Sequence, residues 1–248
     1  MRKFYLELDG VRISLNNESG ILFTNPSGLG TTMANSFAEI SDGFFRRTEK
    51  KQKQGSIAGD LTFFSSAYTS YETFVNSLFT AKKIVFVYDP AGAEYSIDVA
   101  LNYITKTESV LGAYMTVPIS FIPLSMWYTE ETLTGSSPFS ISAGGHIGAA
   151  VELSISGTFM GNEILIADED GTIADVVIDN VSLTEINYSN FYNDCYINGT
   201  DGGGNFIDLT NRVDLTKKIY GHNSGKAFTV TVTNGNVTGT VRRYWRTV

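Results

Sequence analysis

Short runs of alternating apolar and polar residues recur along most of this 248-residue chain, roughly every ten residues. A period of two sends successive side chains to opposite faces of an extended strand. Turn signals separate several runs, at Asp9-Gly10, Asp170-Gly171 and Asn234-Gly235, and such pairs accept the positive φ angles of tight hairpin turns. The pattern predicts a mainly β fold of the sandwich type.

One segment, residues 69–83, departs from this alternation and predicts the chain's single helix. Glu72 follows Thr69 at the spacing of a capping box, so we expect this pair to satisfy free N–H groups of the first turn. Lys82 and Lys83 are expected to favour the negative end of the helix dipole. The apolar residues fall at the spacing of one helical face: Tyr71, Phe74, Val75, Leu78 and Phe79.

Composition and charge exclude several classes of protein. The net charge is −8, with no strongly basic half, so sequence-specific nucleic-acid binding is not expected. The single cysteine, Cys195, cannot form an internal disulfide. Acidic residues interrupt the start of the chain, so we expect no signal peptide. The longest apolar stretch is short and contains Pro118 and Pro123, so no membrane insertion is expected.

Patterns that carry catalysis or metal binding are sparse. The two histidines, His146 and His222, lie among glycines, and no H-E-x-x-H or C-x-x-C spacing occurs. The acidic run 168–171 could bind calcium weakly but lacks the rest of an EF-hand loop, so a solvated hairpin tip is the favoured interpretation. The sequence predicts no catalytic, cofactor or metal site, and therefore a structural or binding protein.

The basic run RRTEKKQK, residues 46–53, lies between two Phe-Phe pairs. This arrangement predicts a long projecting hairpin at about 42–60 with a charged tip. The tip could bind an acidic surface, phosphate or a neighbouring subunit, or its charge could protect an open edge from aggregation. The residues of the candidate oligomer interface are Phe44, Phe45, Arg46, Arg47, Lys50, Lys51 and Lys53.

Residues 187–196, NYSNFYNDCY, mix aromatic, amide and acidic side chains. Such a mixture can bind sugar, which makes Tyr188, Tyr192 and Asp194 candidate glycan contacts. Alternation along a strand would instead bury half of the rings in the core. A carbohydrate-binding β-sandwich that attaches to cell-surface glycans is therefore the alternative function.

A seam near the middle of the chain indicates two domains. The aromatic run that ends at Tyr128 gives way to two acids and then to small polar residues up to position 140. We expect a first domain at residues 1–132 and a second, all-β domain at residues 133–248.

Six segments occur in a characteristic order in the first half: NPSGLG (25–30), GSIAGDLTFF (55–64), YETFVNSLF (71–79), KKIVFVYDP (82–90), YSIDVALNYITKTE (95–108) and VPISFIPLSMWY (117–128). This ordered set resembles the distal tail protein family of bacteriophages with long, non-contractile tails. The resemblance implies an N-terminal β-sandwich-like domain with one α-helix and a projecting hairpin. It also implies a C-terminal galectin-like β-sandwich, which the ending GTVRRYW fits.

The resemblance further implies a structural role at the tail tip of the virion. The N-terminal domains would form a homo-hexameric ring, assembled in the cytoplasm of the bacterial host. The ring would join the tail tube protein to the tail-tip or tail-associated protein, and DNA would pass through its channel without specific binding. The galectin-like domains would dock receptor-binding or other baseplate proteins for host adsorption. No cofactor is implied.

Overall fold

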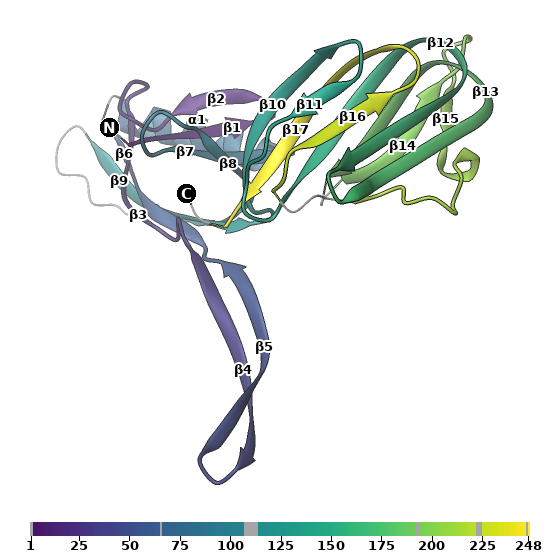
Figure 1. Ribbon diagram of the computed structural model, residues 1–248. Helices are drawn as coiled ribbons and strands as arrows, with labels where there is room; N and C mark the ends of the chain where they lie inside the picture. Colours follow the sequence, from purple (N-terminus) through teal and green to yellow (C-terminus); the bar gives the residue numbers. More distant parts are fainter. Residues whose placement is uncertain (1, 65, 107–113, 192–193, 222–224, 247) are drawn as a thin grey trace. The chain divides into compact units, whose positions relative to one another are not determined.

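The computed structural model describes residues 2–64, 66–106, 114–191, 194–221, 225–246 and 248. The chain divides into two compact units, residues 1–127 with 246–248, and residues 128–245. Strands dominate both units, and the described residues contain one α-helix, so the fold is mainly β as the alternation predicted (Figure 1). The functional boundary between residues 132 and 133 stays a prediction.

The N-terminal unit is built on one antiparallel sheet in the order β2-β1-β7-β8-β9-β6-β3. Backbone hydrogen bonds at Leu15 connect β1 to β3, because its N–H donates to Phe4 O at 3.0 Å and its C=O accepts from Phe23 N at 2.9 Å. The sheet therefore curls until its two sides are bridged. The elements are β1 (Lys3–Leu8), β2 (Val11–Ser14), β3 (Ile21–Ser27), β4 (Thr31–Ser41), β5 (Phe44–Gln54), β6 (Ile57–Phe63), α1 (Ala67–Thr80), β7 (Ile84–Asp89), β8 (Tyr95–Ile104) and β9 (Met115–Pro123).

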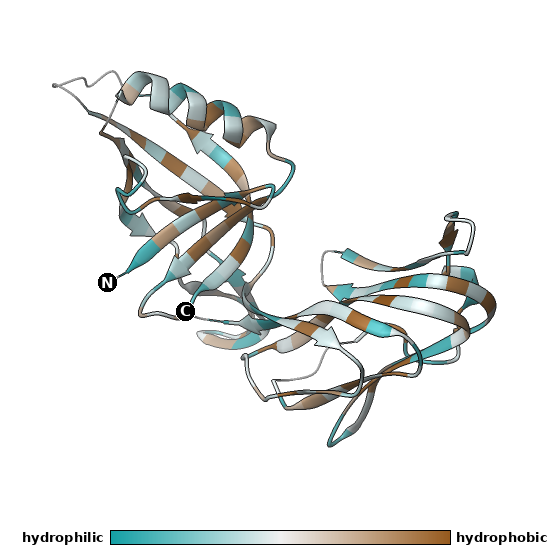
Figure 2. Ribbon diagram, turned by 90° about the horizontal axis from the view of Figure 1, so that it is seen from above, coloured by the Kyte–Doolittle hydropathy of each residue, from teal (hydrophilic) through white to brown (hydrophobic). Residues whose placement is uncertain are grey.

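Aromatic side chains fill the core of this unit. The Phe4 ring lies 5.3 Å from Phe23 and 5.2 Å from Tyr88, centroid to centroid, and Phe86 contacts the fully buried Trp127 at 6.4 Å. Burying each such side chain contributes roughly 1.5–3 kcal/mol. Figure 2 shows apolar positions recurring along these strands, with α1 lying over one end of the unit.

The helix α1 differs from the prediction at both ends. It begins at Ala67, after Ser66 at φ 45°, and Ser66 makes no side-chain cap hydrogen bond. Thr69 therefore lies inside the first turn, and the predicted capping box is wrong. Beyond the last turn, the Asp9 carboxylate accepts the backbone N–H of Lys82 at 3.1 Å and of Lys83 at 2.9 Å. The turn between β1 and β2 thus holds the chain where it leaves α1.

The buried face of α1 is narrower than its apolar pattern suggests. Phe74 and Leu78 are buried, whereas Phe79 is 69% exposed. The Phe74 ring packs edge-on against Phe63 of β6 at 5.7 Å. One strand beneath the helix covers only part of its circumference, which explains why Phe79 stays in solvent.

Strands β4 and β5 form a separate two-stranded sheet that extends away from the rest of the N-terminal unit (Figure 1). The turn lies at Asp42-Gly43, with Gly43 at φ +78°. The hairpin predicted at about 42–60 is therefore displaced in sequence, and the basic run 46–53 lies within β5 instead of forming the tip. Residues 57–63 instead form β6, because alternation turns Ile57, Leu61 and Phe63 into the core.

A close backbone approach holds the base of this hairpin. Gly28 has φ +75°, and a Cβ atom at this position would lie 1.9 Å from the carbonyl oxygen of Ser56. Side chains are therefore excluded at residue 28 both by the left-handed conformation and by the lack of space. Gly30 lies nearby in sequence but has no atom within 4 Å of such a Cβ.

Replacing Gly28 by alanine should destabilise the N-terminal unit by about 2 kcal/mol or more, since strain at positive φ adds to the collision with Ser56. Gly30→Ala is the matched control and should stay within about 0.5 kcal/mol of the parent protein. Urea unfolding followed by Trp127 fluorescence, in a Trp245→Phe background, measures both. Equal effects of the two substitutions would contradict the steric explanation.

The C-terminal unit is organised by two 21-residue strands, β12 and β13, that pair with each other along most of their length. Asp170-Gly171 forms the connection between them, which confirms that predicted hairpin. The elements are β10 (Trp127–Gly135, whose first residue belongs to the N-terminal unit), β11 (Phe139–Ile141), β12 (Gly148–Asp168), β13 (Gly171–Phe191), β14 (Asp194–Thr200), β15 (Phe206–Asp208), the 3-10 turn η1 (Thr210–Arg212), β16 (Phe228–Val232) and β17 (Asn236–Trp245).

Each long strand takes part in two sheets. Residues 148–156 of β12 pair with β17, whereas residues 164–168 pair with β16. The register between β12 and β13 shifts between Ser156 and Gly161, and such bulges let strands bend. Two sheets result, β10-β17-β12-β13-β14-β15 and β11-β16-β12-β13, and apolar side chains from both form one core. Whether this unit is galectin-like stays a prediction.

The prediction of a hairpin at Asn234-Gly235 is wrong, because the two strands that flank this turn do not pair with each other. This turn does join β16 to β17, with Gly235 at φ +94°, but the two strands pair with different halves of β12. The turn therefore carries the chain from one sheet to the other. A local turn signal identifies a reversal of direction but not the partner of the next strand.

A buried amide connects three segments of the C-terminal unit. Asn190 of β13 accepts a hydrogen bond from the Val151 N–H at 2.7 Å and donates one to the Gly221 carbonyl at 2.6 Å. The residue is 1% exposed. Both partners would lose their hydrogen bond in a water-poor environment if this side chain were shortened.

Asn190→Ala should therefore lower the stability of the C-terminal unit by about 2–4 kcal/mol, because two buried backbone groups are left unpaired. Asn187→Ala, in the same strand but at a half-buried position, is the control and should cost under about 1 kcal/mol. Differential scanning calorimetry of the full chain gives both values. A loss for Asn190→Ala no larger than that of the control would show that the two hydrogen bonds add no net stability.

Candidate assembly surface

The hairpin of β4 and β5 exposes large apolar side chains near its outer end. Phe37, Ile40, Phe44 and Phe45 are 61–71% exposed, although such residues usually lie in a core. An isolated two-stranded hairpin is marginally stable in water, since neither face is covered. Apolar groups gathered on an exposed segment of this kind indicate a surface that binds another molecule.

The structure brings together several residues of the predicted oligomer interface. Phe44, Phe45, Arg46 and Arg47 all lie on the outer part of β5, and their side chains are exposed. Lys51 is exposed and forms an ion pair with Glu49. The interface role of this group stays a prediction, which the exposure of Phe44 and Phe45 supports.

Two other residues of the predicted set lie near the base of the hairpin. Lys53 is exposed and stands opposite Thr32 in the register of β4 and β5. The side chain of Lys50 lies outside the described residues.

Sequence reasoning missed the contribution of β4. Phe37 lies directly opposite Arg47, and Glu39 lies opposite Phe45, so one face of the hairpin combines two rings with two charges. The signal was available, because the segment TTMANSFAEIS combines apolar side chains with a single charge. The hairpin predicted at about 42–60 leaves this segment outside, because the turn lies at Asp42-Gly43.

The hairpin is basic in an acidic protein. Five basic and three acidic residues give residues 31–54 a net charge of +2, which leaves −10 for the rest of the chain. Opposite charge favours association of two protein surfaces and steers their encounter. The hairpin is therefore electrostatically suited to an acidic surface.

The two candidate glycan contacts that the structure describes, Tyr188 and Asp194, do not share one surface. Tyr188 is fully buried, and its hydroxyl donates a hydrogen bond to the Ile219 carbonyl at 2.8 Å. Burial also raises the pKa of the Tyr188 hydroxyl. The prediction that Tyr188 contacts a glycan is therefore wrong, because its side chain points into the core from β13. Asp194 is exposed at the start of β14, and Tyr192 lies outside the described residues.

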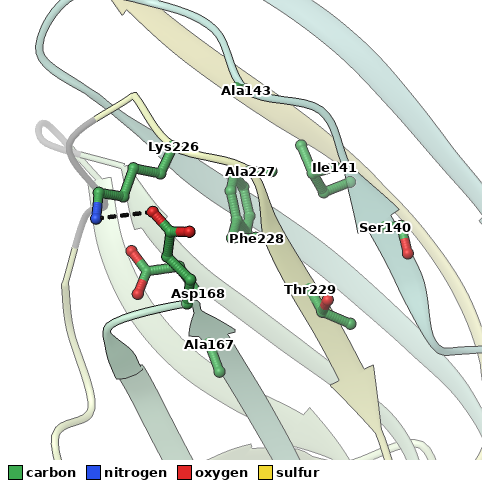
Figure 3. Close-up of a pocket in the computed structure, with 10 residues that line it drawn as sticks. Ser140, Ile141, Ala143, Ala167, Asp168, Lys226, Ala227, Phe228 and Thr229 are labelled. Carbon is green, nitrogen blue, oxygen red and sulfur yellow. Dashed lines mark ion pairs between the residues drawn. The ribbon is translucent and has the colours of Figure 1, made fainter.

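A cavity of about 690 Å³ lies in the C-terminal unit, at the end of β12 and β16 (Figure 3). Ile141 and Phe228 supply apolar walls, and Asp168 lies at the rim with Lys226. The Lys226 ammonium group forms ion pairs with Asp170 and, at 3.0 Å, with Glu169. Hydrogen bonds to these carboxylates raise the pKa of Lys226.

The acidic run 168–171 thus forms a hairpin turn, as predicted, with its charge partly neutralised by Lys226. The exposed carboxylates remain oriented by the lysine, which suits a solvated turn.

The described histidine and the cysteine make packing and hydrogen-bond contacts inside the fold. The His146 ring packs edge-on against Trp245, with ring centroids 5.0 Å apart, and His222 lies outside the described residues. The Cys195 thiol donates a hydrogen bond to the Phe191 carbonyl at 2.8 Å, and burial raises its pKa, which disfavours the reactive thiolate. Over the described ranges, no three His, Cys, Asp or Glu residues cluster as metal ligands. No helix among them is long and apolar enough to span a membrane.

The N-terminal domain of the distal tail protein family matches residues 3–124. The N-terminal unit is therefore a distal tail protein N-terminal domain. The matched range ends just before the seam that follows Tyr128, and it contains the β4–β5 hairpin, α1 and the curled sheet. The resemblance noted in the sequence is thereby confirmed for the N-terminal unit.

Solved structures share the fold of this chain. A chain of the phage P2 baseplate in its activated conformation with Ca superposes at a TM-score of 0.76, with 17% identity over 100% of both chains. SPP1 Dit, described as a hub adsorption apparatus protein of phages that infect Gram-positive bacteria, superposes at 0.62 with 10% identity, over 97% of this chain and 98% of its own. No curated protein matches this chain by sequence.

Shortening the exposed rings should leave the folded subunit intact. Phe44→Ala with Phe45→Ala is expected to change the free energy of unfolding of the monomer by under about 0.5 kcal/mol, because both rings lie in solvent. Phe63→Ala, which removes a buried ring of β6, is the contrast and should cost about 3–5 kcal/mol. Urea unfolding of dilute protein measures both. A large loss for the hairpin variant would mean that the rings pack within one subunit.

Proposed function

We propose that this chain is the structural hub of a phage tail tip, forming a homo-hexameric ring at the distal end of a long, non-contractile tail. The ring joins the tail tube protein to the tail-tip or tail-associated protein. The observation that carries this proposal is the uncovered aromatic and basic hairpin inside a distal tail protein domain. A hub of this kind acts by assembly and carries out no catalysis.

The dimensions of the hairpin support contact with a neighbouring subunit. Each strand has 11 residues, and a rise of about 3.3 Å per residue gives a reach of roughly 36 Å. Phe44 and Phe45 lie at the far end of this reach, beyond the sheet from which the hairpin starts. A second molecule is therefore the natural cover for these rings.

Symmetry connects such a contact to a ring. The hairpin of one copy and the body of the next are different surfaces, so their contact is heterologous, and heterologous contacts between identical subunits close into rings when the rotation permits. The number six comes from the family resemblance. The basic hairpin and the acidic remainder of the chain give this contact complementary charge.

Charge also suits a channel that conducts DNA. Outside the hairpin the chain carries −10, and an acidic wall repels phosphate instead of retaining it. The C-terminal unit then serves as the docking site for receptor-binding or other baseplate proteins. In this proposal the subunits assemble in the cytoplasm of the bacterial host and act in the virion at host adsorption.

Light scattering across a concentration series, with negative-stain images of the same fractions, tests the ring directly. We expect particles of six subunits, and we expect Phe44→Ala with Phe45→Ala to abolish them, since the apolar anchors of the contact are lost. The matched control is Phe79→Ala, which shortens an equally exposed ring on α1 and should leave assembly unchanged. A monomer at every concentration, or rings unaffected by the double substitution, would contradict the proposal.

A further inference from the structure

The hairpin has two edges, and both are open among the strands that the structure describes. β4 and β5 pair with each other and with no other described strand. In an antiparallel pair, alternate residues of each strand direct their N–H and C=O groups away from the partner. Each edge therefore offers a row of backbone groups to which a further strand can pair.

The two edges differ sharply in charge. β4, TTMANSFAEIS, contains one charged residue, Glu39, whereas β5, FFRRTEKKQKQ, contains six. Charged side chains, lysine above all, protect an edge strand against pairing with another chain. By this physical criterion β5 is a protected edge and β4 is an unprotected one.

The side chains of β4 suit a strand that is covered on assembly. Met33, Phe37 and Ile40 are all exposed, and β4 contains neither proline nor glycine to interrupt a ladder. Apolar and aromatic residues stabilise cross-strand neighbours in a sheet by roughly 0.2–1 kcal/mol for each pair. The open edge of β4 thus combines backbone donors and acceptors with apolar side chains.

We propose that β4, and not β5, is the edge through which the hairpin adds a strand of a second copy of this chain. The inference rests on the proposed ring and specifies its contact. Charge identifies the occupant. All five basic residues lie on β5, but paired strands are only about 4.8 Å apart, so the hairpin as a whole, at +2, attracts the rest of another copy of the same chain, which carries −10. In the assembled state the charged edge of β5 faces solvent and prevents further strand addition.

Hydrogen exchange of the purified protein, which contains no other component, tests this directly. Peptides covering residues 31–41 and 44–54 are compared between the dissociated and the assembled protein. We expect about half of the β4 amides to exchange roughly tenfold more slowly on assembly, and the β5 amides to be unchanged. Protection confined to β5, or absent from both strands in fully formed rings, would overturn the inference.

A matched pair of substitutions provides an independent test. Ser36→Lys places an ammonium group on the β4 edge opposite Glu49, so the hairpin itself keeps a favourable cross-strand pair. Thr48→Lys adds the same charge to β5 and removes the hydrogen bond that the Thr48 hydroxyl donates to the Ser36 carbonyl at 3.1 Å, so it is the more disruptive change for the hairpin itself. We expect Ser36→Lys to raise the concentration needed for half-assembly by about tenfold or more, and Thr48→Lys to change it by under about threefold.

The outcomes separate this inference from the function on which it rests. Rings that tolerate Ser36→Lys but not Thr48→Lys would overturn the assignment of the edge and leave the hub standing. Absence of any assembled species at every concentration would overturn both. Circular dichroism of dilute protein, identical for the two variants, shows that neither result reflects unfolding.

Discussion

Every β-strand must satisfy the backbone groups on both of its edges, and this requirement organises the whole chain. The N-terminal unit meets it by curling its sheet until Leu15 bridges β1 and β3 through backbone hydrogen bonds. The C-terminal unit meets it by sharing β12 and β13 between two sheets. The β4–β5 hairpin meets it on one side only, so its outer edges remain for another molecule.

The periodicity of apolar residues in the sequence was sufficient to predict the class of fold and the one helix that the structure describes. Alternation turns Ile57, Leu61 and Phe63 inward, and these positions are buried as the pattern requires. The pairing of strands was harder to predict, because strands that are far apart in the chain leave no local signal of their pairing. β16 and β17 adjoin across Asn234-Gly235 yet pair with opposite halves of β12, and only the bend in β12 explains that result.

On the candidate surface, too, features set by neighbouring residues could be predicted from the sequence, whereas features set by strand pairing could not. The exposure of Phe44 and Phe45 followed from their position beside a charged run, whereas the contribution of Phe37 depended on a register set by the turn at Asp42-Gly43. Tyr188 shows the other outcome, since alternation along the strand predicted that half of the rings in residues 187–196 would be buried, and Tyr188 is one of them. Its hydroxyl finds a carbonyl partner inside the unit, which allows a tyrosine to be buried in a segment of polar character.

The separation of the hairpin from the core of the N-terminal unit has an evolutionary consequence. Because side chains alternate between faces, adding two residues to each strand preserves which residues lie on which face, whereas adding one reverses every outer position. Each addition of two residues per strand lengthens the hairpin by about 7 Å and leaves the packed core unchanged. The reach of the hairpin can thus change in discrete increments while Gly28 and Ser56 keep its base fixed, so one fold can be adapted to binding surfaces at different distances.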